Sequence, residues 1–296
     1  MRCRIRARRP GRRPTKPSLI QALVLGVLHG PAELLPISSS AHVAAIPWLL
    51  GWSYARLEDE LRKSFEVALH AGATAAWLIS PATGRAELTA LLRPPARPGA
   101  KFFLLTATPP AVAGLILERP IERRLGTPPT IAGGLIGGSL AMGLADRSSQ
   151  ERGAEEARGV DALWLGLAQA AALIPGVSRS GATLAAARAR HFSRAASRRL
   201  SDRAAIPVIV GATGLRLVRT LKRSPDERAW LAAGAASSFI STIMLAPRLT
   251  RAQEGRSLLP LAGYRLALAG TILVRLRRAD AASRGSRAAR RRRIRP

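Results

Sequence analysis

The chain has 296 residues, of which 47% are hydrophobic and only 4% aromatic, and its formal net charge at pH 7 is +29. The positive charge is concentrated in the tails and in the connectors between apolar segments, without a basic–aromatic surface pattern, which argues against a nucleic-acid-binding protein. The apolar residues lack the alternation of a membrane β-barrel, and the single cysteine, Cys3, excludes an intrachain disulfide.

Nine apolar segments follow a basic N-terminal tail, whose first sixteen residues carry eight arginines or lysines. The segments are rich in Ala, Leu, Gly, Val and Ile on every face, as expected of helices that lipid surrounds. They cover approximately residues 19–35, 41–52, 65–81, 102–117, 127–145, 160–175, 204–218, 229–247 and 258–274. The pattern predicts an all-α, polytopic bundle of membrane helices.

The chain divides into two tails and one domain. Residues 1–17 and 277–296 form Arg-rich tails that we expect to be disordered and to lie near anionic lipid headgroups. Residues 18–276 form the predicted transmembrane domain, with repeat halves at about 18–146 and 160–276. An offset of 140 residues pairs Gly26 with Gly166, His29 with Gln169, Ile37 with Val177, Ser38 with Ser178 and Ser40 with Ser180. An internal repeat is therefore predicted, and two unrelated loops are the alternative.

Each half contains an apolar segment that is interrupted. Leu19–Leu28 measures roughly 15 Å as a helix, against a hydrocarbon core of about 30 Å, and Pro36 breaks the pattern soon afterwards. Ala162–Ile174 is broken in the same way by Pro175. Non-helical backbone at membrane depth occurs only where protein or a wet cavity surrounds it. We therefore expect the functional site between the two breaks.

The first break is followed by a serine-rich helix start. Ser38, Ser39 and Ser40 can cap free backbone N–H groups, and a helix N-terminus is a ready anion site. Ser39 and His42 are three residues apart and share a helix face, so they could supply a nucleophile and a general acid/base. A polar cap with an incidental histidine is the alternative. Glu33, before the break, could orient His42, bind a divalent cation or pair with an arginine.

The second break carries that arginine. Arg179 offers a planar fork that matches phosphate. The hydroxyl donors around it are Ser178, Ser180 and Thr183. Together the two breaks indicate phosphoryl-transfer chemistry in a membrane-embedded pocket. An ordinary cytoplasmic loop with an arginine that sets topology is the alternative.

These two motifs resemble those of the undecaprenyl-diphosphate phosphatase family, also called bacitracin-resistance proteins. The family pattern (E/Q)GLTEFLP(I/V)SSSGH corresponds here to HGPAELLPISSSAH over 29–42, and PGxSRSGAT corresponds to PGVSRSGAT over 175–183. Weaker similarities follow in family order at FEVALHAG (65–72), IPVIVGAT (206–213) and YRLALAG (264–270). The resemblance covers about residues 18–276.

The resemblance implies inverted-topology repeats with two re-entrant helix hairpins, and removal of the terminal phosphate of undecaprenyl diphosphate for cell-wall synthesis. It implies that Ser39 is the nucleophile with His42 beside it, although the sequence leaves the nucleophile open between the two. It further implies that Arg179 and its serine and threonine neighbours hold the diphosphate, with Ser38 and Ser40 on the opposite motif. Glu33, with His29 as a weaker candidate, would bind Mg²⁺ or Ca²⁺. The expected partners are the polyprenyl diphosphate lipid and membrane lipids, and a homodimer is an open alternative.

Four residues depart from the family pattern or lack an assigned role. His29 replaces a Glu or Gln, and because imidazole suits hard cations less well than carboxylate, it could instead hydrogen-bond Glu33 or phosphate. Asp202 and Arg203 occupy a run that is usually apolar in the family. We expect these two residues either to pair with each other or to lie at the membrane–water interface; otherwise the membrane helix begins late, near residue 204. His70 sits in an apolar segment and could line the cavity.

The main competing function is a transporter or flippase of phosphorylated polyprenyl lipids. Broken helices and an anion site would serve it equally well. The Ser39–His42 pair favours an enzyme, because a flippase needs a phosphate site but no nucleophile.

Overall fold

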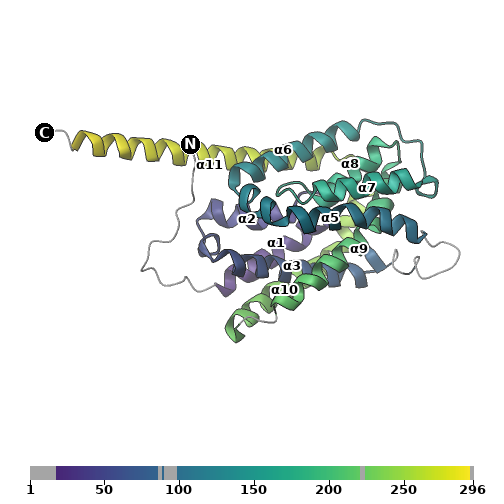
Figure 1. The fold of residues 1–296 in the computed structure, drawn as a ribbon, viewed down its shortest axis with the longest axis horizontal. Helices are drawn as coiled ribbons and strands as arrows, with labels where there is room; N and C mark the ends of the chain where they lie inside the picture. Colours follow the sequence, from purple (N-terminus) through teal and green to yellow (C-terminus); the bar gives the residue numbers. More distant parts are fainter. Residues whose placement is uncertain (1–17, 86–88, 90–98, 221–223, 294–296) are drawn as a thin grey trace.

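The computed structural model describes residues 18–85, 89, 99–220 and 224–293, and its regular elements within these ranges are helices (Figure 1). The α-helices are α1 (Leu19–Leu34), α2 (Ser39–Leu50), α3 (Asp59–Ile79), α5 (Ala100–Leu125), α6 (Pro128–Ala145), α7 (Gly159–Ala171), α8 (Arg179–Ala189), α9 (Arg194–Thr220), α10 (Pro225–Gln253) and α11 (Leu259–Arg293), with 3₁₀ turns at Ser53–Arg56 and Ala154–Glu156. The predicted all-α fold is confirmed.

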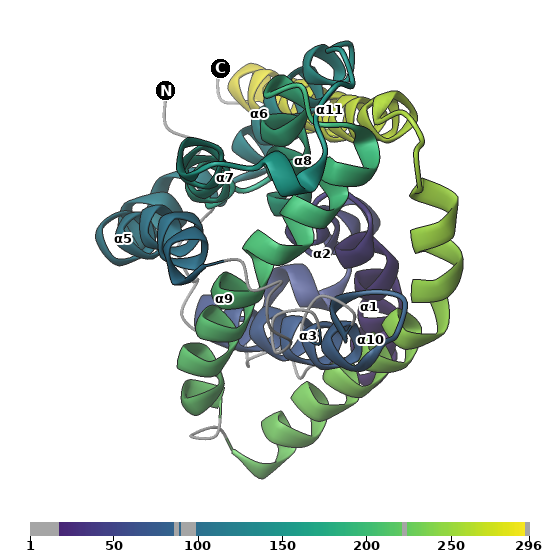
Figure 2. The same ribbon diagram turned by 90° about the vertical axis from the view of Figure 1, so that its right-hand side faces the viewer.

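The helix packing repeats between the two halves. α1 packs along α10, and its counterpart α7 packs along α5. α2 contacts α11, and its counterpart α8 contacts α6, the counterpart of α11. The contacts α3–α9 and α6–α11 each join a helix of one half to its counterpart in the other half. Figure 2 shows α6, α8 and α11 on one side, α1, α3 and α10 on the other, and α9 between them. This exchange of partners supports the predicted internal repeat; its inversion across the membrane and the re-entrant hairpins remain predictions.

Within the part of the chain that the structure describes, three helices are long and apolar enough to cross a membrane. The spans are Ala100–Leu117, Pro225–Gln253 and Leu259–Ala282, and α1 and α2 are shorter apolar helices. On α5, Leu115 and Ile116 are 83% and 68% exposed, as expected of side chains that face lipid. The structure thus supports a membrane protein with both full-length and shortened apolar helices.

Small residues bring α1, α3 and α10 close together. A methyl group at Gly30 of α1 would lie 2.7 Å from the backbone nitrogen of Thr242 on α10, so only glycine fits there. Gly72 of α3 similarly abuts the carbonyl oxygen of Ala235. In lipid, where apolar surface alone does not drive helix association, such close backbone contact supplies packing energy.

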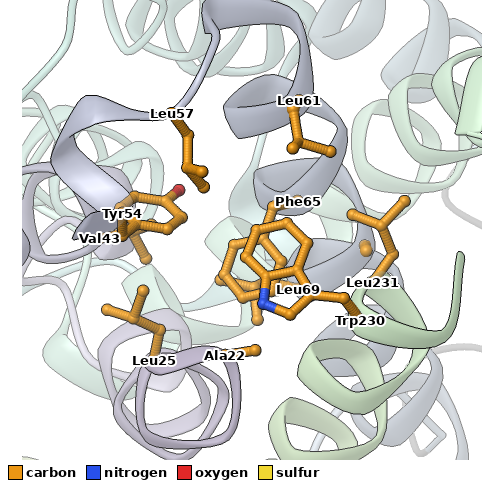
Figure 3. Close-up of a cluster of buried hydrophobic side chains, with 11 residues drawn as sticks. Ala22, Leu25, Val43, Tyr54, Leu57, Leu61, Phe65, Leu69, Trp230 and Leu231 are labelled. Atoms are coloured by element: carbon orange, nitrogen blue, oxygen red, sulfur yellow. The ribbon is translucent and has the colours of Figure 1, made fainter. Parts of the chain in front are cut away.

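An aromatic cluster anchors the same three helices (Figure 3). Phe65 of α3 stacks on Trp230 of α10 with ring centroids 4.2 Å apart, and Tyr54 meets Phe65 edge-on at 5.5 Å. Leu25 of α1 is fully buried in this cluster. The cluster fixes α1 at a point two turns before the polar residues that end it.

Two expectations about helix ends are wrong. The C-terminal tail is not disordered from residue 277, because α11 continues as a helix to Arg293 and projects past the bundle in Figure 1. Alanine and arginine are strong helix formers, and they extend a helix that the apolar part has already nucleated. The N-terminal tail, 1–17, lies outside the described residues.

The second correction concerns α9, which begins at Arg194 rather than near residue 204. Asp202 therefore lies within a helix and pairs with Arg198 one turn earlier, at 3.0 Å. The Arg198–Asp202 pair compensates the charges that made this segment look unsuited to a membrane.

Candidate functional site

The two breaks in the apolar segments meet in space. α1 ends at Leu34 with α2 beginning at Ser39, and α7 ends at Ala171 with α8 beginning at Arg179. The guanidinium of Arg179 donates from Nη2 to Oε1 of Glu33 at 3.3 Å. Residues 146 positions apart thus share one site, as the repeat predicted.

Glu33 also accepts a hydrogen bond from the expected nucleophile. Ser39 Oγ donates to Glu33 Oε2 at 2.6 Å, so the carboxylate bridges Ser39 and Arg179. Ser38, just before, has a left-handed backbone with φ 73°, a conformation that costs a non-glycine residue about 1–3 kcal/mol. Such strain is typical of functional sites, and here it turns the chain from α1 into α2 so that Ser39 meets Glu33.

The expected Ser39–His42 pair does not form. His42 Nδ1 donates to the carbonyl of Ser38 at 2.8 Å, because a carbonyl can only accept. His42 Nε2 then carries the lone pair and accepts from the Tyr264 hydroxyl, also at 2.8 Å. Since both ring nitrogens are occupied, Glu33 rather than His42 is placed to take the Ser39 proton. The shared helix face was correct, but the α-helical geometry turns the imidazole back to its own i−4 carbonyl.

The serines of the two motifs are arranged alike. Ser38 Oγ lies 3.3 Å from Ser40 Oγ, and Ser178 Oγ lies 3.2 Å from Ser180 Oγ. Ser178 caps α8 through the backbone nitrogen of Gly181 at 3.2 Å, whereas Ser38 makes no capping bond to α2. Ser40 is exposed and Ser180 lines a pocket, so these two hydroxyls are the more accessible of the four.

Thr183 is not in a position to bind substrate. It is fully buried, and its hydroxyl lies 2.6 Å from that of Ser201 on α9. It also donates to the carbonyl of Arg179 at 3.0 Å. Because Thr183 lies one turn into α8, its side chain faces the neighbouring helix, and it holds α8 against α9.

A small pocket opens beside Glu33 and Arg179. Its lining residues are Glu33, Leu34, Ala73, Thr74, Trp77, Arg179, Ser180, Leu184, Arg198, Ser201, Asp202 and Ile209. Arg198 places a second guanidinium in this wall, and Trp77 provides an apolar face beside the charged one. The sequence interpretation missed these residues because they come from α3 and α9, far from both motifs.

Arg265 is a further residue without a predicted role. It is 0% exposed on α11 and donates to the carbonyls of Pro36 at 3.0 Å and Gly176 at 3.1 Å, one in each break. A third bond reaches Ser139 Oγ on α6 at 3.2 Å. One guanidinium therefore ties the two broken segments to each other. Its signal in the sequence was an arginine inside an apolar segment, which must face protein rather than lipid.

A second ion-pair centre closes one end of the bundle. Asp146, which caps α6, accepts from Arg194 Nε at 3.1 Å, and its carboxylate lies 3.6 Å from the buried Arg188. Burial pushes the pKa of Asp146 upward, but hydrogen bonds from Arg194, Ser257 and the Leu258 backbone outweigh burial and hold the pKa below its usual value. These contacts join α6 to α9 and to the start of α11.

The two residues expected to bind a cation, Glu33 and His29, lie close together, and His70 joins them. Ligand atoms of His29, Glu33 and His70 lie within 4.8 Å of one another. Mg²⁺ and Ca²⁺ require several oxygen ligands, and this group supplies one carboxylate and two imidazoles. The group therefore does not fit the predicted Mg²⁺ or Ca²⁺, and no chemical step is assigned to either ion.

Comparison with known proteins identifies the family of the chain. Residues 22–271 match the family described as bacitracin resistance protein BacA. The chain is similar to an undecaprenyl-diphosphatase of Geobacter sulfurreducens, with 38% identity over 87% of this chain and 98% of the relative. It also resembles undecaprenyl-diphosphatase of Pelobacter propionicus, with 35% identity over 86% of this chain and 96% of the relative. Undecaprenyl-diphosphatase 1 of Bacillus anthracis is 33% identical over 85% of this chain and 96% of the relative. The chain therefore belongs to the BacA family of bacitracin resistance proteins.

Proposed function

We propose that this protein is a membrane-embedded undecaprenyl-diphosphatase, which removes the terminal phosphate of undecaprenyl diphosphate and regenerates the monophosphate carrier for cell-wall synthesis. The observation that carries the proposal is the Ser39–Glu33–Arg179 arrangement at the meeting of the two breaks. It brings the Ser39 hydroxyl and the Arg179 guanidinium to the Glu33 carboxylate, which supports their assignment as nucleophile, phosphate-binding cation and base. Relatives that this chain matches over nearly their whole length carry the name of this activity.

The geometry supports attack by Ser39 on the terminal phosphorus. Glu33 Oε2 takes the proton as Ser39 Oγ forms its bond to phosphorus, and the anhydride bond to the lipid breaks. Undecaprenyl monophosphate leaves with that proton, so that Glu33 is ionised again. Water then attacks the phosphorus of the phosphoserine, Glu33 accepts a proton from the water and returns it to Ser39 Oγ, and inorganic phosphate leaves. Arg179 Nη2 lies near enough to exchange its Glu33 contact for the phosphoryl oxygens and stabilise their charge. His42 is a weaker nucleophile candidate, since Tyr264 occupies its free nitrogen.

A transporter or flippase of phosphorylated polyprenyl lipids is less well supported. It would use the arginines of the pocket, but it has no need of a serine held at 2.6 Å from a carboxylate. The names of the relatives also point to the enzyme.

Several finer points belong to this proposal. The enzyme acts in the inner (plasma) membrane, where its lipid substrate is present. A homodimer and a role of the basic tails at anionic headgroups are predictions that size-exclusion chromatography with light scattering and vesicle binding would examine.

The test is phosphate release from undecaprenyl diphosphate by the full chain purified in detergent. We expect Ser39→Ala and Glu33→Gln each to lower kcat by about 10²–10⁴-fold, the usual contribution of a nucleophile–base pair. Ser64→Ala is the matched control, because the Ser64 hydroxyl only bonds the Glu60 carbonyl of its own helix at 2.9 Å. Full activity of Ser39→Ala, or lipid translocation in vesicles without phosphate release, would refute the phosphatase.

A further inference from the structure

His29 and His70, which the proposed phosphate chemistry does not use, form a three-residue cluster with Glu33, the proposed base. His29 and Glu33 are one turn apart on α1, and His70 reaches them from α3. His70 Nε2 lies 3.6 Å from Glu33 Oε2, and His29 Nε2 lies 4.0 Å from the same oxygen. The two imidazoles meet edge-on with ring centroids 4.6 Å apart.

The hydrogen bonds around His29 fix which of its nitrogens faces the cluster. Ser238 Oγ gives its own proton to the carbonyl of Leu69 at 3.0 Å. It must therefore accept from His29 Nδ1, also at 3.0 Å. The proton of His29 is held at Nδ1. The lone pair of Nε2 faces Glu33 Oε2 at 4.0 Å and lies 3.3 Å from His70 Nδ1, a longer contact that a metal ion on His29 would replace. An outer partner of this kind is typical of histidines that bind metal ions.

His70 is oriented in the same manner. Its Nδ1 lies 2.8 Å from the carbonyl of Glu66, which can only accept, so Nδ1 carries the proton. Its Nε2 is then the atom that faces the Glu33 carboxylate. In a neutral His70 this nitrogen presents a lone pair to a carboxylate oxygen at 3.6 Å, and a cation between them turns that repulsion into attraction.

The spacing and exposure suit a small transition-metal ion. Two ligands at the usual distance from tetrahedral Zn²⁺ are about 3.4 Å apart, close to the 3.6 and 4.0 Å observed here. The His29 side chain is fully buried, whereas those of Glu33 and His70 are 20% and 39% exposed, so the cluster has one open side. Two imidazoles and one carboxylate are the donors of catalytic zinc sites, which keep a position open for water or substrate.

We propose that His29, His70 and Glu33 bind a transition-metal ion of the Zn²⁺ or Co²⁺ class in preference to Mg²⁺ or Ca²⁺. Imidazole nitrogen favours these metals, whereas the hard cations favour oxygen. As a cofactor of the reaction the ion rests on the proposed function, where it would add positive charge beside Ser39 and the diphosphate. Metal binding itself is measured without substrate.

The test uses the full chain in detergent, stripped with a chelator and titrated with Co²⁺. We expect a visible ligand-field spectrum, about one metal ion per chain by elemental analysis, and retention of Co²⁺ in excess Mg²⁺. His29→Ala and His70→Ala should abolish the spectrum; His70→Ala is expected to fold because that side chain is part-exposed. Ser238→Ala should weaken binding about 10–100-fold through the lost outer bond.

His191→Asn is the matched control. It removes a histidine that contacts Ser149 and leaves the cluster intact, and asparagine tolerates the left-handed backbone there. Failure of the wild-type protein to bind Co²⁺, or undiminished binding by both alanine variants, overturns the proposal. A chain that releases phosphate but binds no Co²⁺ refutes the metal site alone, and one that binds Co²⁺ but releases no phosphate refutes the phosphatase alone.

Discussion

Replacing Arg265 should uncouple the two broken segments. In Arg265→Met, the Pro36 and Gly176 carbonyls lose their donor inside the protein. An unsatisfied buried acceptor costs about 1–3 kcal/mol, so the two together cost roughly 2–6 kcal/mol. Because methionine also relieves the cost of burying a charge, we expect a net loss of stability near the lower end, about 2 kcal/mol.

The larger effect of Arg265→Met should be on catalysis. The two carbonyls belong to the breaks that carry Ser39 and Arg179, and a shift of about 1 Å between reacting groups can cost 10²-fold in rate. We therefore expect kcat for phosphate release to fall about 100-fold. Arg265→Lys should also be impaired, because an ammonium cannot span both carbonyls as a planar guanidinium does.

The assay combines steady-state phosphate release with thermal unfolding in detergent. Arg62→Met is the matched control, since Arg62 forms a part-exposed ion pair with Asp59 on its own helix at 2.7 Å. Wild-type kcat in a folded Arg265→Met variant would refute the view that this residue positions the site.

Three further predictions concern residues outside the catalytic pair. Asp146→Asn leaves Arg188 buried without its counter-ion and should cost about 3–5 kcal/mol of unfolding free energy. Since the Asp146 pKa is lowered in the folded state, the stability of the wild type should decrease below about pH 4, and that of the variant should change less. Unfolding of both proteins that does not depend on pH would contradict this. Thr183→Val should lower the free energy of unfolding by about 1–3 kcal/mol without raising KM. A tenfold rise in KM would show instead that Thr183 belongs to the substrate-binding site. Tyr264→Phe removes the bond to His42 and should cost about 0.5–1.5 kcal/mol, with loss of all activity arguing instead for a catalytic His42.

The sequence was sufficient for the fold class and for the meeting of the two breaks. Proline after a short apolar run, repeated at one spacing, predicts interruptions that must be buried together, and the Glu33–Arg179 contact is the result. Helix ends were less predictable. α11 extends beyond its apolar part because Ala and Arg continue a helix wherever one has started.

Side-chain partners within the site could not be derived from spacing. Ser39 and His42 do share a helix, but the choice between Glu33 and His42 as the partner of Ser39 depends on how α1 approaches α2. The role of Arg265 depends on two carbonyls more than 80 positions away from it. Such tertiary contacts leave no periodic signal in one sequence.

The most direct test of the active site is a double-mutant cycle on Ser39 and Glu33. Phosphate release would be measured for the wild type, Ser39→Ala, Glu33→Gln and the double variant under one set of conditions. If the two side chains act as one nucleophile–base unit, the double variant should lose no more kcat/KM than Ser39→Ala alone. Losses that multiply would show that Glu33 and Ser39 act independently, and the central account of the site would be wrong.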